Sequence, residues 1–315
     1  MLAVLAGGVG AARLLTGAVR VVDPSTIVAI VNTGDDMTLH GLQISPDIDT
    51  VVYTLAGLHN PATGWGIVTE SWTTMAELER IGGSTWFRLG DRDLATHLYR
   101  TQRLAEGAAL HEVTAEIARA RGVGVHVVPM SDDAVRTRLV LAEDADGVLA
   151  GTEVAFQHYF VRLRHAVAVR SVRFDGAAAA SPAPGVLDAI GDAEVVVVSP
   201  SNPVVSIGPI LAVPGVRNAL AARRDQVVAV SPIVAGAALK GPADRLLAEL
   251  GYESSAVGVA RLLAEWVGTL VIDEQDAHLK DAVESEGLRA VVAPTIMSSP
   301  EVAASLATVV LDAAR

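Results

Sequence analysis

The sequence predicts an α/β fold: a Rossmann-like, doubly wound and mostly parallel sheet with a β-rich insertion. Short apolar runs that end in turn residues alternate with segments of helical periodicity, which is the pattern of a sheet with helical crossovers. The runs are apolar throughout rather than at every second position, as strands covered on both faces must be. A chain of 315 residues is long enough to bury such a core.

The expected elements follow one another along the chain. The strands are Leu2–Ala6, Thr26–Val31, Val123–Val128, Val195–Ser199, Val227–Val230, Thr269–Ile272 and, with a weaker signal, Ala290–Val292. The helices are Ala11–Val21, Leu94–Ala105, Leu110–Ala120, Pro242–Leu250, Ser255–Val267 and Glu301–Ala314. Residues 132–178 differ, because the extended runs Thr137–Leu141, Val148–Leu149 and Val154–Phe174 contain few helix signals. We therefore expect one composite α/β domain, residues 1–315, in which residues 132–178 form a β-rich insertion or edge extension.

Composition excludes several classes of protein. The hydrophobic content of 51% excludes a disordered chain, and the lack of cysteine excludes a disulfide scaffold, a thiolate metal site and a cysteine nucleophile. The net charge of -12 argues against general nucleic-acid binding. No apolar stretch reaches the roughly 18 residues of a bilayer span, and the first residues lack the basic region of a signal peptide. We expect a cytoplasmic protein without nucleic-acid or membrane partners.

A glycine loop follows the first expected strand and opens a helix. Its residues Gly8, Val9 and Gly10 let backbone N–H groups approach a phosphate at the helix N-terminus. Arg13 stands where a dinucleotide fingerprint has its third small residue, and no Gly-Lys-Ser/Thr follows, so neither that fingerprint nor a Walker A loop is complete. A tight turn that needs glycine is the alternative, but phosphate contact is favoured.

Four carboxylates follow the second expected strand within 15 positions: Asp35, Asp36, Asp47 and Asp49. Gathered at one sheet edge, they would repel one another unless a cation or a proton intervened. Oxygen ligands without cysteine favour Mg²⁺ over zinc. Alternatively, Asp47 or Asp49 is the N-cap of a helix over Thr50–Leu58.

A third segment, Arg88–Asp93, leads into a helix that carries more basic residues. Asp91 is a plausible helix cap. The spacing of Arg92, His97 and Arg100 places them on roughly one helix face, which predicts a basic surface for a phosphate. The alternative is a solvated helix with local ion pairs.

Two further polar loops follow later strands. One contains Ser201 and Asn202 between prolines, and the other ends in Lys240, which can neutralise phosphate charge. Each loop by itself is also compatible with a stiff turn. Five polar loops at one end of one sheet, however, indicate a binding site, because ligands gather outside the carboxyl ends of parallel strands.

In order along the chain, these motifs resemble the 2-phospho-L-lactate transferase family of coenzyme F-420 biosynthesis, which includes phosphoenolpyruvate transferases. The resemblance covers nearly the whole chain. Its motifs are Gly7–Gly10, Asn32–Asp36, Ser45–Thr50, Leu89–His97, Met130–Asp133, Phe156–Gln157, Ser201–Pro209 and Ser231–Ile233.

The resemblance implies a Rossmann-like core, Mg²⁺ and a transfer reaction. The donor is lactyl- or enolpyruvyl-2-diphospho-5'-guanosine, and the acceptor is the ribityl hydroxyl of the deazaflavin Fo (7,8-didemethyl-8-hydroxy-5-deazariboflavin), with GMP released. It also implies that Asp49 and Arg88 contact Fo. By the same resemblance, the glycine loop, Ser201 and Asn202 would hold the guanosine diphosphate end. We add Asn32 and Lys240 as expected nucleotide- or phosphate-binding residues. A homodimer is implied by resemblance alone.

Phosphoryl transfer depends on positioning and on neutralising charge, which suggests roles for the charged residues. As a hypothesis, Asp35 and Asp49 bind the metal, or Asp49 accepts the hydroxyl proton. Arg92 and Lys240 would offset the developing phosphate charge.

Other functions are compatible with parts of the sequence. A non-catalytic, nucleotide-sugar-binding regulator related to gluconeogenesis factor would be similar in fold and glycine loop. A nicotinamide-dependent oxidoreductase is disfavoured by Arg13 and by Asn32, which stands where an acidic residue would end the second strand. The choice between lactyl and enolpyruvyl donor stays open, because Met37–Thr38 and Phe156–Phe160 depart from the family pattern.

Overall fold

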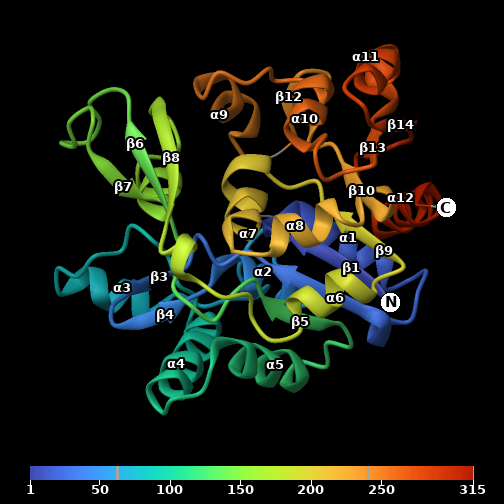
Figure 1. The fold of residues 1–315 in the computed structure, drawn as a ribbon. Helices are drawn as coiled ribbons and strands as arrows, with labels where there is room; N and C mark the ends of the chain where they lie inside the picture. The colour runs from blue at the N-terminus through green and yellow to red at the C-terminus, as the bar shows by residue number, and fades with distance from the viewer. Residues whose placement is uncertain (62–63, 240, 315) are drawn as a thin grey trace.

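The computed structural model describes residues 1–61, 64–239 and 241–314, built around a seven-stranded sheet (Figure 1). Every neighbouring pair in this sheet is parallel. In spatial order the strands are β14 (Arg289–Val292), β13 (Thr269–Ile272), β10 (Val227–Val230), β9 (Val195–Val198), β1 (Leu2–Ala6), β2 (Ile27–Val31) and β5 (His126–Pro129). The predicted fold class and all seven predicted strands are confirmed.

The strands are apolar throughout because both faces of the sheet are buried. Ala3 and Leu5 of β1 belong to one core cluster, and Leu2, Val4 and Ala6 belong to the other. This is the two-residue period of a strand with a core on each side.

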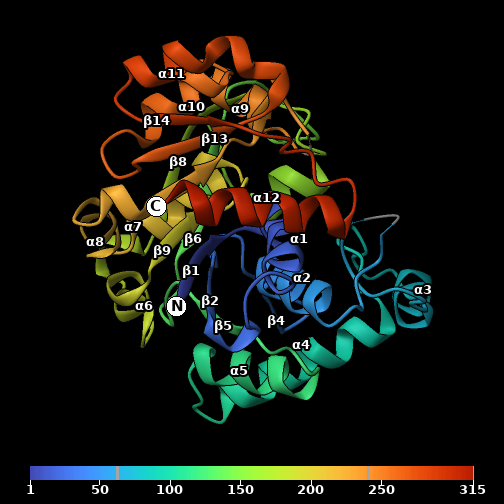
Figure 2. The ribbon, with the colours of Figure 1, turned by 90° about the vertical axis from the view of Figure 1, so that its right-hand side faces the viewer.

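Helices cover both faces of the sheet, which makes the fold doubly wound. One face is covered by α1 (Gly8–Ala18), α2 (Pro46–Leu55), α5 (Leu110–Ala120) and α12 (Pro300–Ala313), and Figure 2 shows α12 beside α1. The other is covered by α6 (Val186–Asp192), α7 (Gly208–Ala212), α8 (Val216–Ala221), α10 (Ala256–Leu263) and α11 (Lys280–Ser285). Among the described residues, no helix combines the length and apolar content needed to cross a bilayer.

The order of the strands places a switch point between β1 and β9. From β1 the chain adds β2 and then β5 on one side, and it later returns to add β9, β10, β13 and β14 on the other. The loops that leave β1 and β9 therefore diverge to opposite faces and leave a crevice between them, where open α/β sheets bind ligands.

The insertion contains an antiparallel sheet of β7 (Glu153–Ala155), β6 (Arg136–Leu141) and β8 (Val169–Asp175). Two details of the expectation were wrong. Val148 makes only an isolated bridge to Ala145, and His158–Arg162 is a π-helix within the segment that we expected to be extended. The π-helix lets Phe156 and Phe160 stack with ring centroids 5.3 Å apart, an i,i+4 contact that an extended chain cannot make.

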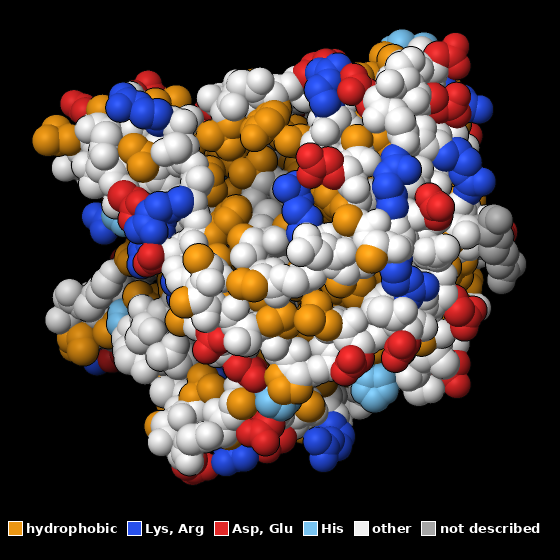
Figure 3. Space-filling model, in the orientation of Figure 1, with side chains coloured by type: hydrophobic (Ala, Val, Ile, Leu, Met, Phe, Trp, Pro, Cys, Tyr) orange, Lys and Arg blue, Asp and Glu red, His pale blue; other side chains and the backbone are white. Residues whose placement is uncertain are grey.

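Apolar side chains join the insertion to the main body. Leu139 of β6 and Tyr159 of the π-helix pack in one cluster with Leu246 of α9 (Ala243–Glu249). Figure 3 shows apolar side chains gathered in the hollow between the small sheet and the region of α9. The insertion is thereby fixed against the sheet's carboxyl end.

Helix boundaries differ from the expected ones near the polar loops. Helix α1 begins at Gly8 rather than Ala11, and α10 ends at Leu263. Helix α2 begins at Pro46 with Ser45 as its N-cap, so Asp47 and Asp49 lie in its first turn and are not N-caps. Elements that we did not predict include α3 (Thr73–Arg80) and two hairpins, β3 (Met37–Leu39) with β4 (Leu42–Ile44) and β11 (Ile233–Val234) with β12 (Ala237–Ala238).

Candidate active site

A cavity of about 880 Å³ lies over the crevice between β1 and β9. It is lined by residues of all five polar loops. The predicted site residues in its lining are Gly8, Val9, Gly10, Asn32, Asp35, Asp49, Arg88, Ser201 and Asn202. Arg92 is not among the described lining residues, and Lys240 lies outside the described part of the chain.

The glycine loop packs tightly against the loop after β9. A Cβ on Gly10 would lie 2.3 Å from the carbonyl oxygen of Pro200, and Gly8 has a φ of +69°. The Ser201 hydroxyl donates to the carbonyl oxygen of Gly7 at 2.7 Å, and the Asn202 side chain accepts from the N–H of Val204 at 2.9 Å. Glycine is therefore required here for packing and backbone conformation. Ser201 joins the two loops, whereas Asn202 stabilises the turn of its own loop.

Asp35 and Asp47 form a pair of carboxylates at the cavity. One oxygen of Asp35 accepts from Gln157 at 3.0 Å, while its Oδ1 is buried without a hydrogen-bond partner among the described residues. Asp47 accepts from the Asn32 amide at 2.9 Å. Desolvation and the charge of Asp47 raise the pKa of Asp35 well above its ordinary value, and desolvation raises the pKa of Asp47 to about 6.

This pair fits a Mg²⁺ ion. Its donors are carboxylate oxygens, one of which lacks a partner, and a bound cation would remove the repulsion that raises the pKa of Asp35. Asp36 lies behind the pair, where its carboxylate accepts from the Ser45 hydroxyl at 2.8 Å. Desolvation raises the pKa of Asp36 to about 7.

Asp49 is held differently, by an arginine. The fully buried guanidinium of Arg100 binds both carboxylate oxygens of Asp49, with one of the two contacts at 3.1 Å. This bidentate ion pair supplies the counter-charge of Asp49 from within the protein. Our expectation that Asp49 binds metal or acts as a base is therefore not favoured by its surroundings.

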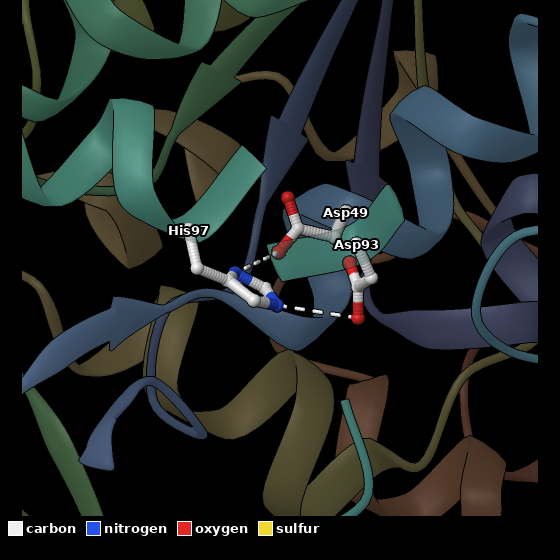
Figure 4. A group of neighbouring side chains, drawn as sticks. All are labelled: Asp49, Asp93 and His97. Atoms are coloured by element: carbon white, nitrogen blue, oxygen red, sulfur yellow. Dashed lines mark ion pairs between the residues drawn. The ribbon is translucent and has the colours of Figure 1, made fainter. Parts of the chain in front are cut away.

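A buried chain of polar contacts continues from this pair (Figure 4). His97 Nδ1 lies 3.7 Å from Asp49, and His97 Nε2 lies 3.2 Å from Asp93, which also accepts from the Tyr53 hydroxyl at 2.6 Å. Because a guanidinium nitrogen of Arg100 lies 3.3 Å from Nδ1 and can only donate, we assign the histidine proton to Nε2. Burial alone would raise the pKa of Asp93, but the contacts from His97, Tyr53 and Arg100 lower it.

Asp49, Asp93 and His97 lie close enough together to share a metal ion. The guanidinium of Arg100 already supplies positive charge to this group, however, and it would repel a second cation. The group is therefore better explained as a buried polar network that ties α2 to α4 (Asp91–Ala105), although His97 Nε2 and Arg100 Nε make no hydrogen bond with a described residue.

The prediction of a basic face on α4 was wrong. His97 comes five positions after Arg92, which is about 140° around a helix, so the two point to different sides. Arg92 is exposed and donates to the carbonyl oxygen of Val68 at 2.9 Å, whereas His97 and Arg100 are buried. Asp91 occupies the first position of α4, where its carboxylate accepts from the N–H of Thr73 at the start of α3.

Aromatic side chains form another part of the cavity wall. Those in the described lining are Tyr53, Trp65, Trp86, Phe87, Phe156, Tyr159 and Phe160. The Arg88 guanidinium lies 4.5 Å from the ring centroid of Trp72, which anchors this arginine beside them. The arrangement offers flat apolar surfaces next to fixed charges, as binding of a polar ring compound requires.

Comparison with known proteins identifies the family. The family model described as 2-phospho-L-lactate transferase CofD matches residues 2–305. The chain belongs to this family. Proteins named phosphoenolpyruvate transferase are similar along their whole length: that of Kitasatospora aureofaciens is 45% identical over 98% of this chain and 95% of its own, and that of Mycolicibacterium smegmatis is 41% identical over 99% and 98%.

The fold of this CofD-family chain also has a solved counterpart. A member of the UPF0052 family from Bacillus halodurans superposes with a TM-score of 0.65, covering 98% of this chain and 99% of that one at 16% identity. Identity that low shows a shared fold and nothing about activity. The transferase assignment rests on the family match and on the relatives above.

Several residues of this transferase's cavity were not predicted as site residues. Asp47 was considered only as one of four acids, and Gln157 and Tyr53 had no assigned role. The spacing of Asp93, His97 and Arg100 at i, i+4 and i+7 was a readable signal for one helix face. The contact between Gln157 and Asp35 joins positions 122 residues apart, so no local pattern could reveal it.

Proposed function

We propose that this protein transfers a phosphoenolpyruvyl or phospholactyl group from a guanosine-diphosphate-linked donor to the ribityl hydroxyl of Fo, with release of GMP, in coenzyme F-420 biosynthesis. The observation that carries the proposal is one cavity in which a glycine loop, a carboxylate pair and aromatic walls meet. The names of the relatives favour the enolpyruvyl donor. A cytoplasmic location and a homodimer remain predictions.

Within this reaction, Asp35 and Asp47 are the proposed Mg²⁺ ligands. Asp47 takes the place that we first gave to Asp49, because Arg100 engages both oxygens of Asp49. Mg²⁺ at this pair would neutralise the negative charge of the donor's phosphates. Asn32, which donates to Asp47, orients one of the two proposed ligands.

The acceptor side is proposed to lie along Asp49, Arg88 and the aromatic wall. Asp49 is paired with Arg100 and lines the cavity, so its remaining lone pairs can accept a hydrogen bond from a substrate hydroxyl. Arg88, fixed on Trp72, offers a donor beside the rings. Arg92 has no part in this proposal, because its guanidinium is turned to Val68.

The decisive test is a transfer assay with separated products. Fo and Mg²⁺ are incubated with the lactyl or the enolpyruvyl donor, and deazaflavin products are followed by fluorescence after chromatography. We expect a more anionic deazaflavin and an equal amount of GMP, formed faster with the enolpyruvyl donor. A folded protein that forms no product, does not bind Fo and binds UDP-sugars tightly would instead be the nucleotide-sugar-binding regulator.

A further inference from the structure

Arg13 is a cation at the cavity without a partner in the described part of the chain. It is exposed and lines the cavity, and it makes no hydrogen bond or ion pair with any described residue. The other basic side chains in the described lining are engaged: Arg88 lies on Trp72, and His97 pairs with Asp93. The guanidinium of Arg13 is thus available to a ligand.

The position of Arg13 on α1 directs it toward the glycine loop. Val9 and Gly10 precede it by four and three residues, so all three share one helix face, and all three line the cavity. Side chains on a helix incline toward its N-terminus, which carries the long Arg13 side chain back over the first turn. A ligand at that turn would meet both the guanidinium and the free backbone N–H groups.

The first turn of α1 is itself suited to an anion. The helix has no acidic residue in its first turn and no side-chain cap on Gly7, so no group of its own balances the partial positive charge there. Asp47 lies beside this turn, since a Cβ on Gly8 would be 3.2 Å from its Oδ1, and Asp35 and Asp49 line the same cavity. A cation that neutralises Asp35 and Asp47 would therefore favour an anionic ligand at this turn, and the test below includes Mg²⁺ for that reason.

From these observations we infer that Arg13 binds the diphosphate of the nucleotide donor and so selects for nucleoside diphosphates. The inference rests on the proposed function and names a residue that this function had left unused. A guanidinium binds phosphate oxygens through two parallel N–H donors, which gives geometric selectivity as well as charge. The residue that disfavours a dinucleotide fingerprint thereby has a role of its own.

Calorimetric titration of GDP, guanosine and Fo, with Mg²⁺ present, tests the inference. Arg13→Gln should weaken GDP binding about tenfold or more and leave the affinities for guanosine and Fo unchanged. Arg13→Lys keeps the charge without the fork, so it should fall between Arg13→Gln and the native protein. Arg170→Gln is the matched control, because Arg170 is also exposed and without a described partner but lies outside the cavity lining.

Three results would overturn the inference. Equal GDP affinity for Arg13→Gln and the native protein would mean that Arg13 does not contact the diphosphate. An equal loss for guanosine would place Arg13 at the base or ribose. The same titration also tests the proposed function, which fails if the native protein binds only one of Fo and GDP. If GDP is the ligand that does not bind, the inference about Arg13 fails as well. Because Arg13 is exposed, the variants should unfold at the native temperature.

Discussion

At the scale of single residues, the buried ion pair of Asp49 and Arg100 is a main contact that fixes the site's structure. The pair lies almost fully out of water, with Arg100 at 0% and Asp49 at 4% exposure. A buried ion pair of this kind adds modest net stability when complete, but removing one partner leaves an uncompensated buried charge. We therefore expect the loss of Arg100 to affect the stability of the fold more directly than the rate of the reaction.

Replacing Arg100 with methionine tests this. We expect Arg100→Met to lower the free energy of unfolding by about 3–5 kcal/mol, because Asp49 is left buried and unpaired. Arg103 on the same helix pairs at the surface with Glu116, and Arg103→Met should cost less than about 1 kcal/mol. Urea unfolding of both variants measures the difference. Equal losses of unfolding free energy in the two variants would show that the buried pair contributes no more to stability than the surface pair.

Asp36 predicts a pH dependence of stability. Its pKa is raised from 3.8 to about 7 by desolvation, so the folded protein holds a proton that the unfolded chain has released. This contribution is full below about pH 4 and is lost as the pH rises through 7. Asp36→Asn removes the titration, so the variant's stability relative to the native protein should rise between pH 5 and pH 8.

A second acid provides the control for this experiment. Hydrogen bonds from the Ser71 hydroxyl and from Thr74 lower the pKa of Asp91, so it is ionised in both states throughout that range. The effect of Asp91→Asn should therefore be the same at pH 5 and pH 8. Urea unfolding at the two pH values measures both effects. If the effect of Asp36→Asn on the unfolding free energy is also the same at pH 5 and pH 8, Asp36 is already ionised in the folded protein.

At the scale of elements, the contact between α1 and the loop after β9 is the tightest part of the site. Gly10→Ala would place a Cβ 2.3 Å from the backbone oxygen of Pro200, which must move away. We expect a loss of about 1–3 kcal/mol in unfolding free energy, typical of overpacking. Gly191 in α6 has open space around it, so Gly191→Ala should be neutral or stabilise by about 0.5–1 kcal/mol. A stable Gly10→Ala variant would contradict this packing.

The elements that could be predicted are those with a long or continuous pattern. The buried strands were found because each is apolar on both faces, and α5 was found over its full range because its apolar period is regular. Helices α8 and α11 were missed because six residues hold less than two turns of periodicity. The π-helix was missed because its residues are aromatic and β-branched, which locally favours a strand.

At the scale of the whole molecule, strand order creates the site. The residues that meet at the cavity leave different strands, and they converge because parallel strands end at one edge. This convergence could be expected from the sequence. The division of the acids into a pair facing the cavity, Asp35 and Asp47, and an arginine-bound Asp49 could not, because it depends on Arg100, 51 residues further along.

The most direct test of the proposed site is a crystal structure with GDP, Fo and Mn²⁺, in which anomalous scattering locates the metal. We predict one Mn²⁺ peak at Asp35 and Asp47, GDP across the crevice between β1 and β9, and Fo along the aromatic wall near Asp49. A metal peak at Asp49, Asp93 and His97, or a nucleotide bound away from the crevice, would contradict the claim that this one cavity holds donor, acceptor and metal together.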